Sequence, residues 1–252
     1  MKVYTVLAII LLLTVSQSSL YGQESDSIPE KQGSKATEII GIAIPAAMIS
    51  YGLISLGDNG IRKIDMNVQH SLERNNRFWH TSADDYVWFT PAVAAYTMKF
   101  CKVESSNNLL DMSILYGLSN ILAGGITYST KFIAGRERPD KSGNWSFPAG
   151  HAQFAFIAAE FLHQEYKDKS VWISIGGYSA ATFVAVARVC NNEHWVSDVV
   201  AGAGIGILST KIVYWAYPYL RKKIGKKDQT FQTFIFPGYS NGNFNLALSC
   251  RF

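Results

Sequence analysis

The chain has 252 residues, of which 48% are hydrophobic and 17% are charged, and its formal net charge is +4. This length is sufficient for one domain with a substantial core, whereas the small and scattered charge excess does not favour a nucleic-acid partner. The three cysteines are an odd number without ligand spacing, so the sequence predicts neither a disulfide framework nor a zinc site.

Residues 1–22 have the pattern of a secretory signal peptide. Lys2 provides the positive start, residues 6–15 form the apolar core, and Gly22 ends a candidate cleavage site. The alternative is an uncleaved anchor, and under either interpretation the chain is exported. Residues 23–35 are polar, which predicts a disordered leader.

Apolar residues recur at helical spacing in six segments, which predicts an all-α fold built as a six-helix bundle. The segments are Ala36–Leu56, Tyr86–Cys101, Leu109–Thr130, His151–His163, Val171–Ala187 and Val196–Tyr217. Many of their residues are Gly, Ala or Ser, which allow close helix packing in a bilayer and in a soluble bundle alike. Only the first, third and sixth segments are comfortably long enough to cross a hydrocarbon core.

The stretch between the first two segments, residues 58–85, is polar. It includes a predicted short surface helix around Ile61–Glu73. The pair Asp84-Asp85 precedes the second segment, and we interpret it as a helix cap rather than as an acid–base pair.

The C-terminal region, residues 221–252, begins with a basic run and then changes character. Hydrophobic residues alternate with polar ones after Asn241-Gly242, which predicts a small β-hairpin. The basic run, together with Lys167 and Lys169 in an earlier loop, predicts a cytoplasmic end of the bundle. The opposite end would then face outward.

Three short clusters separate the apolar helices of the central region. They are Lys131–Pro139, Ser146–His151 and Arg188–Asp198. A phosphate ester carries up to two negative charges, and its transfer spreads charge over three oxygens. Arginine forks, a lysine and the free N–H groups of a helix start suit such an anion.

Two histidines in these clusters are candidates for proton and phosphoryl transfer. His194 and Asp198 are four residues apart at a predicted helix start, hence on one face. The carboxylate can hold one imidazole nitrogen while the other attacks phosphorus. His151, at another helix start, can protonate the leaving oxygen.

The joint spacing Lys-x6-Arg-Pro, Pro-x-Gly-His and Arg-x5-His-x3-Asp resembles the signature of the type 2 phosphatidic acid phosphatase (PAP2) superfamily. The resemblance implies a PAP2/chloroperoxidase-like bundle over residues 36–220, and metal-independent hydrolysis without a cofactor through a phosphohistidine intermediate. It implies a catalytic set of His194 as nucleophile, His151 as acid and then base, and Asp198 as orienter of His194. The implied phosphate ligands are Lys131, Arg138, Gly150 and Arg188.

Two positions depart from the family pattern. Ala149 stands where the second motif usually has serine, and Ala187 stands where the third usually begins with serine. A lost hydroxyl removes one neutral donor, on the order of 1 kcal/mol in binding. Every charged or nucleophilic member is present, so the sequence predicts an active enzyme.

The leading hypothesis is a phosphatase that acts on a lipid-linked phosphate in the bacterial cell envelope. Its partners would be the phosphorylated lipid and the inner membrane, with the site facing the periplasm. Lipid A phosphate, undecaprenyl diphosphate and phosphatidate-type lipids all fit the implied substrate class. The alternatives are a soluble or peripheral periplasmic acid phosphatase for soluble monoesters, and a non-catalytic bundle that binds anionic headgroups.

Overall fold

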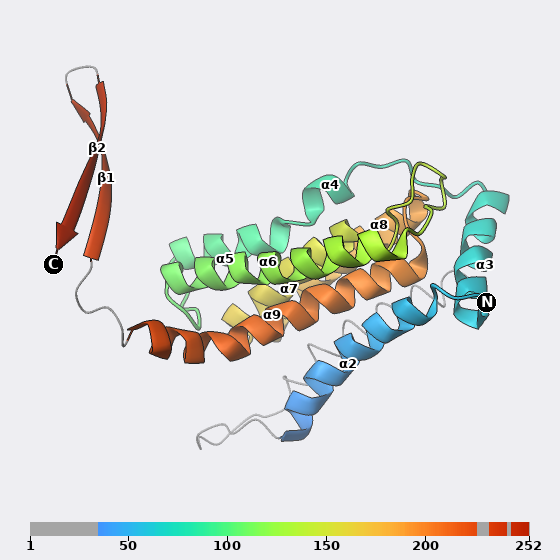
Figure 1. The fold of residues 1–252 in the computed structure, drawn as a ribbon, viewed down its shortest axis with the longest axis horizontal. Coiled ribbons are helices and arrows are strands. Elements are labelled where there is room, and N and C mark those ends of the chain that lie inside the picture. The colour runs from blue at the N-terminus through green and yellow to red at the C-terminus, as the bar shows by residue number, and fades with distance from the viewer. Residues whose placement is uncertain (1–34, 226–231, 241–242, 252) are drawn as a thin grey trace. The chain divides into compact units, whose positions relative to one another are not determined.

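The computed structural model describes residues 35–225, 232–240 and 243–251, so the predicted signal peptide and all of the leader but Lys35 lie outside the described residues. A helical unit ends at Val213, and a second unit begins at Tyr214. The helices are α2 (Lys35–Ile54), α3 (Gly60–Arg74), α4 (Asp84–Val87), α5 (Thr90–Phe100), α6 (Leu109–Ala134), α7 (Gly150–Tyr166), α8 (Val171–Cys190) and α9 (Val196–Gly225) (Figure 1).

Each of the six predicted segments contains a helix, but the count of six is not confirmed, because α3 and α4 are additional. The second segment differs most. It is divided into the four-residue α4 and the longer α5, which has Pro91 in its first turn. A proline suits that place because a first-turn N–H has no partner within the helix.

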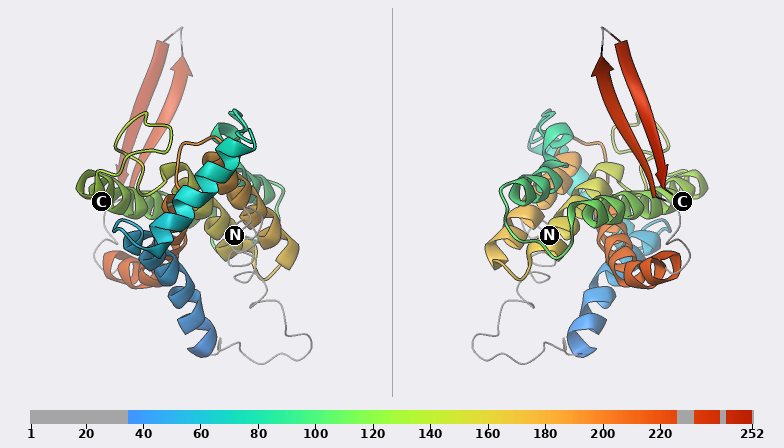
Figure 2. Two further views of the ribbon diagram at one scale, coloured as in Figure 1. Left: turned by 90° about the vertical axis from the view of Figure 1, so that its right-hand side faces the viewer. Right: turned by 90° about the vertical axis from the view of Figure 1, so that its left-hand side faces the viewer.

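The sequence predicted α3 as a short surface helix, but one of its faces is buried. Asn59 caps it, since its side-chain oxygen accepts from the Ile61 N–H at 2.9 Å. One face, formed by Asp65, Val68 and Leu72, is buried. Figures 1 and 2 show α3 lying across the end of the bundle at which α6 stops and α7 and α9 begin.

Small residues bring α9 into backbone contact with its neighbours, as their abundance predicted. A Cβ atom on Gly202 would lie 2.4 Å from the Ala149 carbonyl oxygen at the start of α7. A Cβ atom on Gly204 would lie 2.7 Å from the Pro45 carbonyl oxygen of α2. Glycine at both positions is therefore required for α9 to pass this close to α7 and to α2.

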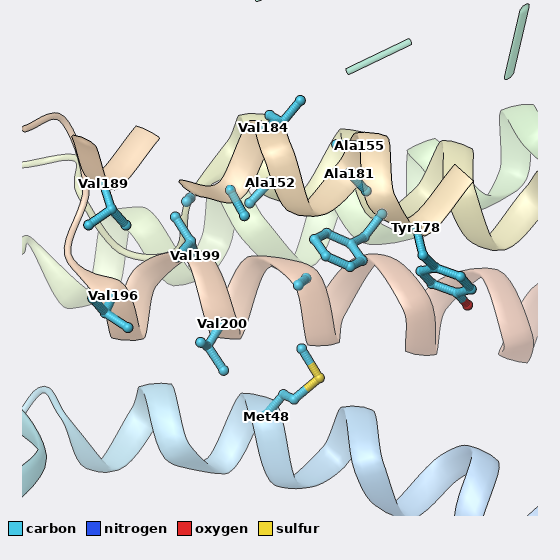
Figure 3. Packing of buried hydrophobic residues seen from close by; sticks show 14 of the residues in the cluster. Met48, Ala152, Ala155, Tyr178, Ala181, Val184, Val189, Val196, Val199 and Val200 are labelled. Atoms are coloured by element: carbon cyan, nitrogen blue, oxygen red, sulfur yellow. The ribbon is translucent and has the colours of Figure 1, made fainter. Parts of the chain in front are cut away.

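The core lies along α7, whose residues are buried at almost every position. Figure 3 shows Val200 of α9 directed towards Met48 of α2, while Val199 lies on the side of Ala152 in α7. Because these side chains are small, the helix axes approach closely and dispersion contacts accumulate along the whole interface. The packing of α7 thus fixes the position of its N-terminus, which carries the second cluster.

Among the described residues, three helices are long and apolar enough to cross a membrane: Leu109–Ala134, Val171–Cys190 and the stretch Val196–Lys222 of α9. The third and sixth segments are therefore long and apolar enough, as predicted, and the fifth joins them because it extends to Cys190, beyond its predicted end. In the helix of the first segment the described side chains reach only from Ile39 to Ile54, so its predicted span stays a prediction. Helix α6 also exposes large apolar side chains, among them Ile121 and Phe132.

The C-terminal unit contains β1 (Gln232–Ser240) and β2 (Asn243–Arg251). The strands pair in antiparallel register, with Gln232 opposite Arg251 and Ser240 opposite Asn243. The turn residues Asn241 and Gly242 lie outside the described residues, so the predicted hairpin turn stays a prediction.

Candidate active site

The three clusters meet at one end of the helical unit, and Asp198 is their common partner. The Ala149 N–H donates to the Asp198 carbonyl oxygen at 3.0 Å. The Ser146 hydroxyl donates to Asp198 Oδ2 at 2.5 Å. Between the first and third clusters, Trp195 Nε1 donates to the Glu137 carbonyl oxygen at 2.8 Å. The structure therefore brings together segments that are far apart in the sequence.

A buried ion-pair network lies beneath this junction. Arg136 donates through Nη1 to Asp198 Oδ1 at 2.7 Å and through Nη2 to Asp65 Oδ2 at 2.8 Å. Asp65 also accepts from the Ser197 N–H at 3.0 Å and from its hydroxyl at 2.5 Å. Burial raises the pKa of Asp65, while Ser197 and Arg136 oppose that rise. Neither Arg136 nor Asp65 is among the site residues that the sequence motifs predict.

His194 is only 3% exposed, at the start of α9. Burial lowers its pKa to about 4, the neighbouring Asp198 opposes this shift, and the charges of Lys131 and Arg188 add to it. The imidazole is therefore neutral near pH 7, and a neutral ring nitrogen retains the lone pair that a nucleophile needs.

The predicted hydrogen bond between His194 and Asp198 is not formed. His194 Nδ1 lies 3.8 Å from Asp198 Oδ2, which is too long for a hydrogen bond. The carboxylate oxygen instead accepts from the Ser146 hydroxyl and from the Trp195 N–H, the latter at 3.1 Å. Catalytic hydrogen bonds are often long in ligand-free structures and shorten in the substrate complex.

Arg188 is buried and lies against carboxylates on two sides. Its Nη1 donates to Asp84 Oδ2 at 2.7 Å, and its Nη2 contacts Glu193 Oε2. Its Nε has no hydrogen-bond partner among the described residues. One edge of the guanidinium is thus fixed by a buried carboxylate, while the other edge keeps an unused donor.

Two further predicted phosphate ligands flank this arginine. Arg138 Nη1 lies 3.9 Å from the same Glu193 oxygen that contacts Arg188. Lys131 Nζ donates to the Trp145 carbonyl oxygen at 2.6 Å, which directs it towards the loop that precedes the second cluster. The three predicted cations therefore gather at one end of the bundle.

The start of α7 presents Gly150 and His151 to the same region. Apart from its own chain neighbours and helix backbone, no described atom lies within 4 Å of a Cβ built on Gly150, so the space beside it is open. The first N–H groups of a helix have no partner within the helix, and they attract anions. The predicted phosphate ligand Gly150 thus lies where an anion has room to approach.

His151 is partly exposed, with its Nε2 3.2 Å from Asp85 Oδ1. Burial lowers its pKa, Arg188 and Arg138 add to that shift, and Asp85 and Asp84 oppose it. A proton on this nitrogen is therefore held less tightly than on an ordinary histidine, which suits transfer to a leaving group.

The interpretation of Asp84-Asp85 as a helix cap was wrong. The N-terminal residue before α4 is Ala83, which makes no side-chain cap. Asp84 is fully buried and pairs with Arg188, while Asp85 pairs with His151. Both carboxylates instead contact predicted site residues. Sequence spacing could not reveal these contacts, because Asp84 and Arg188 are far apart along the chain.

Ala149 and Ala187, where the family pattern usually has serine, are both fully buried. Ala149 is the residue before α7, and its φ of −75° and ψ of 114° are those of an ordinary N-cap. The methyl group of Ala149 makes no side-chain cap for α7.

Residues 113–222, which contain all three clusters, match the family model of the PAP2 superfamily. Over this part of its length the chain is similar to the superfamily. It is 35% identical over 153 residues to lipid A 1-phosphatase of Porphyromonas gingivalis, a match that covers 60% of this chain and 34% of that protein. It is 28% identical over 95 residues to a putative phosphatidate phosphatase of Drosophila melanogaster, covering 34% of this chain and 25% of that protein.

The chain thus spans about a third of the length of the Porphyromonas relative and a quarter of the Drosophila one. Among solved structures, a transmembrane PAP2-type phosphatidylglycerolphosphate phosphatase of Bacillus subtilis is 17% identical, with a TM-score of 0.36 over 90% of this chain and 98% of that chain.

Proposed function

We propose that this PAP2 protein is a metal-independent phosphatase that hydrolyses a lipid-linked phosphate through a phosphohistidine on His194. The observation that carries the proposal is a neutral His194, whose pKa is lowered by burial and further by the charges of Lys131 and Arg188. A neutral nucleophile beside fixed cations suits attack on an anionic phosphate. The names of the two curated relatives support the same reaction class.

The proposed reaction has two displacements. In the first, His194 Nε2 attacks phosphorus, the bond from phosphorus to the lipid oxygen breaks, and His151 gives its proton to that oxygen. In the second, His151 takes a proton from water, whose oxygen attacks phosphorus, and the phosphorus–nitrogen bond breaks to release inorganic phosphate. Asp198 would accept the Nδ1 hydrogen of His194 once the 3.8 Å gap closes.

The positive charge for this reaction would come from side chains. Lys131, Arg138 and Arg188 supply three cations, and the α7 N-terminus supplies N–H groups near Gly150. Within the described part of the chain, no three His, Cys, Asp or Glu residues are grouped so that they could hold a metal ion. We therefore propose that turnover requires no divalent cation.

An apolar groove beside the site favours a lipid over a soluble ester. It is a cavity of about 190 Å³ between α2, α6 and α9. Its lining is Ile49, Leu53, Ile126, Thr130, Phe147, Ile205, Leu208, Ser209 and Ile212. Phe147 follows Ser146, which binds Asp198, so the groove reaches the second cluster. Since α6 and α9 are candidate membrane spans, we propose that the groove holds a hydrocarbon tail of the substrate.

Phosphate release from detergent-dispersed lipid A and phosphatidate, compared with a soluble monoester, tests this function. We expect faster turnover of a lipid, unchanged by EDTA. Preference for the soluble monoester would favour the acid-phosphatase alternative, and binding of lipid without turnover would favour the non-catalytic one. Loss of activity in EDTA that a divalent ion restores would contradict the proposed mechanism.

The substitution Ile126→Trp should fill the groove and separate the two substrate types. We expect lipid turnover at low substrate to fall about tenfold or more, because excluding two methylenes costs roughly 0.8 kcal/mol each. Hydrolysis of the soluble monoester should change less than about twofold. Ile121→Trp, an exposed position on the same helix outside the groove, is the matched control. Equal losses on both substrates in Ile126→Trp would argue against a tail in the groove.

The pH dependence should report the carboxylate that faces His151. As general acid, His151 must be protonated, so kcat/KM should fall as the pH rises through its pKa, which lies below the ordinary 6.5. Asp85→Asn removes a charge that raises this pKa, so the falling limb should move to lower pH. Asp84, Arg188 and Arg138, which also act on His151, remain unchanged. Asp58→Asn, at an exposed acid, is the control, and an unmoved limb in Asp85→Asn would argue against His151 as the acid.

We further propose that the protein lies in the inner membrane with this site facing the periplasm. The support is the three long apolar helices and the basic residues Lys167 and Lys169 in the loop after α7, opposite the α7 N-terminus. Labelling from outside intact cells of a cysteine introduced at the exposed Ser142 tests the orientation.

A further inference from the structure

Glu193 places a carboxylate between the two arginines of the phosphate site. Its Oε2 contacts Arg188 Nη2 and lies 3.9 Å from Arg138 Nη1. Both arginines are phosphate ligands in the proposed function, on which this inference rests. One oxygen of Glu193 therefore occupies a position that an oxygen of the substrate phosphate would need.

Arg188 contacts two carboxylates, of which Asp84 is fixed and Glu193 can be replaced. Asp84, fully buried, holds Nη1 at 2.7 Å, and its removal would leave the arginine without a fixed orientation. The Glu193 side chain is 25% exposed, and within the Arg188 guanidinium it contacts Nη2 alone. Solvent is therefore accessible to the Glu193 carboxylate if it moves away.

The edge that Glu193 contacts is also the edge with an unused donor. Arg188 Nε and Nη2 lie side by side on the guanidinium and together form a two-point fork for an oxyanion. Glu193 engages Nη2, while the buried Nε has no hydrogen-bond partner in the described part of the chain. A phosphate can supply an oxygen to each donor, so it makes the more complete contact.

The backbone around Glu193 is held in place independently of its side chain. The Glu193 N–H donates to the Arg188 carbonyl oxygen at 3.1 Å, and the His194 N–H donates to the same oxygen at 3.3 Å. Asn192 has a φ of +62°, which completes the tight turn at the end of α8. Rotation of the Glu193 side chain therefore requires no movement of the neighbouring His194.

We propose that Glu193 is an internal competitor for phosphate, which binds Arg138 and Arg188 in the empty site and swings into solvent when a phosphate enters. Every phosphate that binds must displace this carboxylate. The site therefore binds phosphate more weakly than the same arginines would without Glu193. The same competition returns the arginines to Glu193 after hydrolysis and promotes the release of inorganic phosphate.

Inhibition by inorganic phosphate, measured on the purified full chain in detergent, tests this proposal. Glu193→Gln and Glu193→Ala should each lower the inhibition constant on the order of tenfold, since the loss of one charge-assisted contact removes the competitor. The single-turnover rate of lipid release should change less than about threefold, because Glu193 takes no part in bond breaking. Glu137→Gln, which removes the same charge from an exposed residue beside Arg138, should leave the inhibition constant within about twofold.

The alternative outcomes are distinct. An unchanged or higher inhibition constant in both Glu193 variants would overturn the proposal, as would a single-turnover rate reduced by about a hundredfold, which would mean that Glu193 is needed to position Arg188. An equal decrease in Glu137→Gln would also overturn it, since general charge would then be the cause. If the wild-type protein neither hydrolyses a phosphate ester nor binds inorganic phosphate, both the proposed function and this inference fail.

Discussion

His194→Ala is expected to reduce phosphatase activity by at least about a thousandfold, because the proposed covalent route is lost with its nucleophile. The acid-quenched wild-type protein should carry a phosphorus–nitrogen adduct after incubation with labelled substrate, and the variant should not. Activity of the variant within about tenfold of wild type would contradict the assignment of the nucleophile.

The fold should survive this change. His194 is neutral, and its Nδ1 has no hydrogen-bond partner among the described residues, so the alanine variant loses no strong polar contact there. His194→Gln preserves more of the side-chain volume and should be equally inactive, which separates lost chemistry from a packing defect. His70→Ala, at an exposed histidine of α3, should retain full activity. A thermal midpoint close to that of wild type completes the comparison.

Arg136→Met is expected to destabilise the protein by about 3–5 kcal/mol, because it leaves Asp65 and Asp198 buried without their common cation. For a domain of this size the thermal midpoint should fall on the order of 10 °C. Activity should fall as well, since Arg136 positions the carboxylate that faces His194.

The pH dependence of that loss identifies its cause. The pKa of Asp65 already lies above its ordinary value in the wild-type protein. Protonation therefore neutralises the unpaired carboxylate at low pH, and the difference in stability should shrink as the pH falls. Arg74→Met, at the exposed end of the same helix as Asp65, should change the midpoint by no more than a degree or two. A similar small effect for Arg136→Met would show that the buried network contributes little to stability.

Local sequence determined which segments are helices and where the predicted site residues lie on them. The 3.6-residue period of apolar positions depends only on neighbours within a few turns, so the first residues of α6, α8 and α9 were predicted correctly. Each helix continues beyond its predicted end, and α9 does so most, to Gly225 instead of Tyr217. The break between α4 and α5 was missed because the apolar pattern continues through Pro91. The length of α8 was also underestimated. The helix continues to Cys190 because the sequence contains no helix breaker between Ala187 and Cys190.

The three motif spacings likewise placed Lys131, Arg138, His151, Arg188 and His194 at helix ends, and the resemblance assigned their proposed roles. This was possible because each motif is a contiguous stretch in which helix ends position the side chains. The expected contact between His194 and Asp198 followed from their spacing of four residues, but spacing determines only a shared face. It does not determine which other donors a carboxylate oxygen accepts from. Here Asp198 Oδ2 accepts from the Ser146 hydroxyl and the Trp195 N–H instead.

Only the tertiary structure revealed the acidic partners of the site. Asp65, Asp84 and Asp85 come from a stretch that looked like a solvated connection, and their partners Arg136, Arg188 and His151 follow between about 65 and 105 residues later. Burial gives such long-range pairs their importance, because a charge removed from water must find a counter-charge wherever the fold provides one. No local pattern marks these acidic residues. Their contacts with the site depend on the position of α3 and α4 across the end of the bundle.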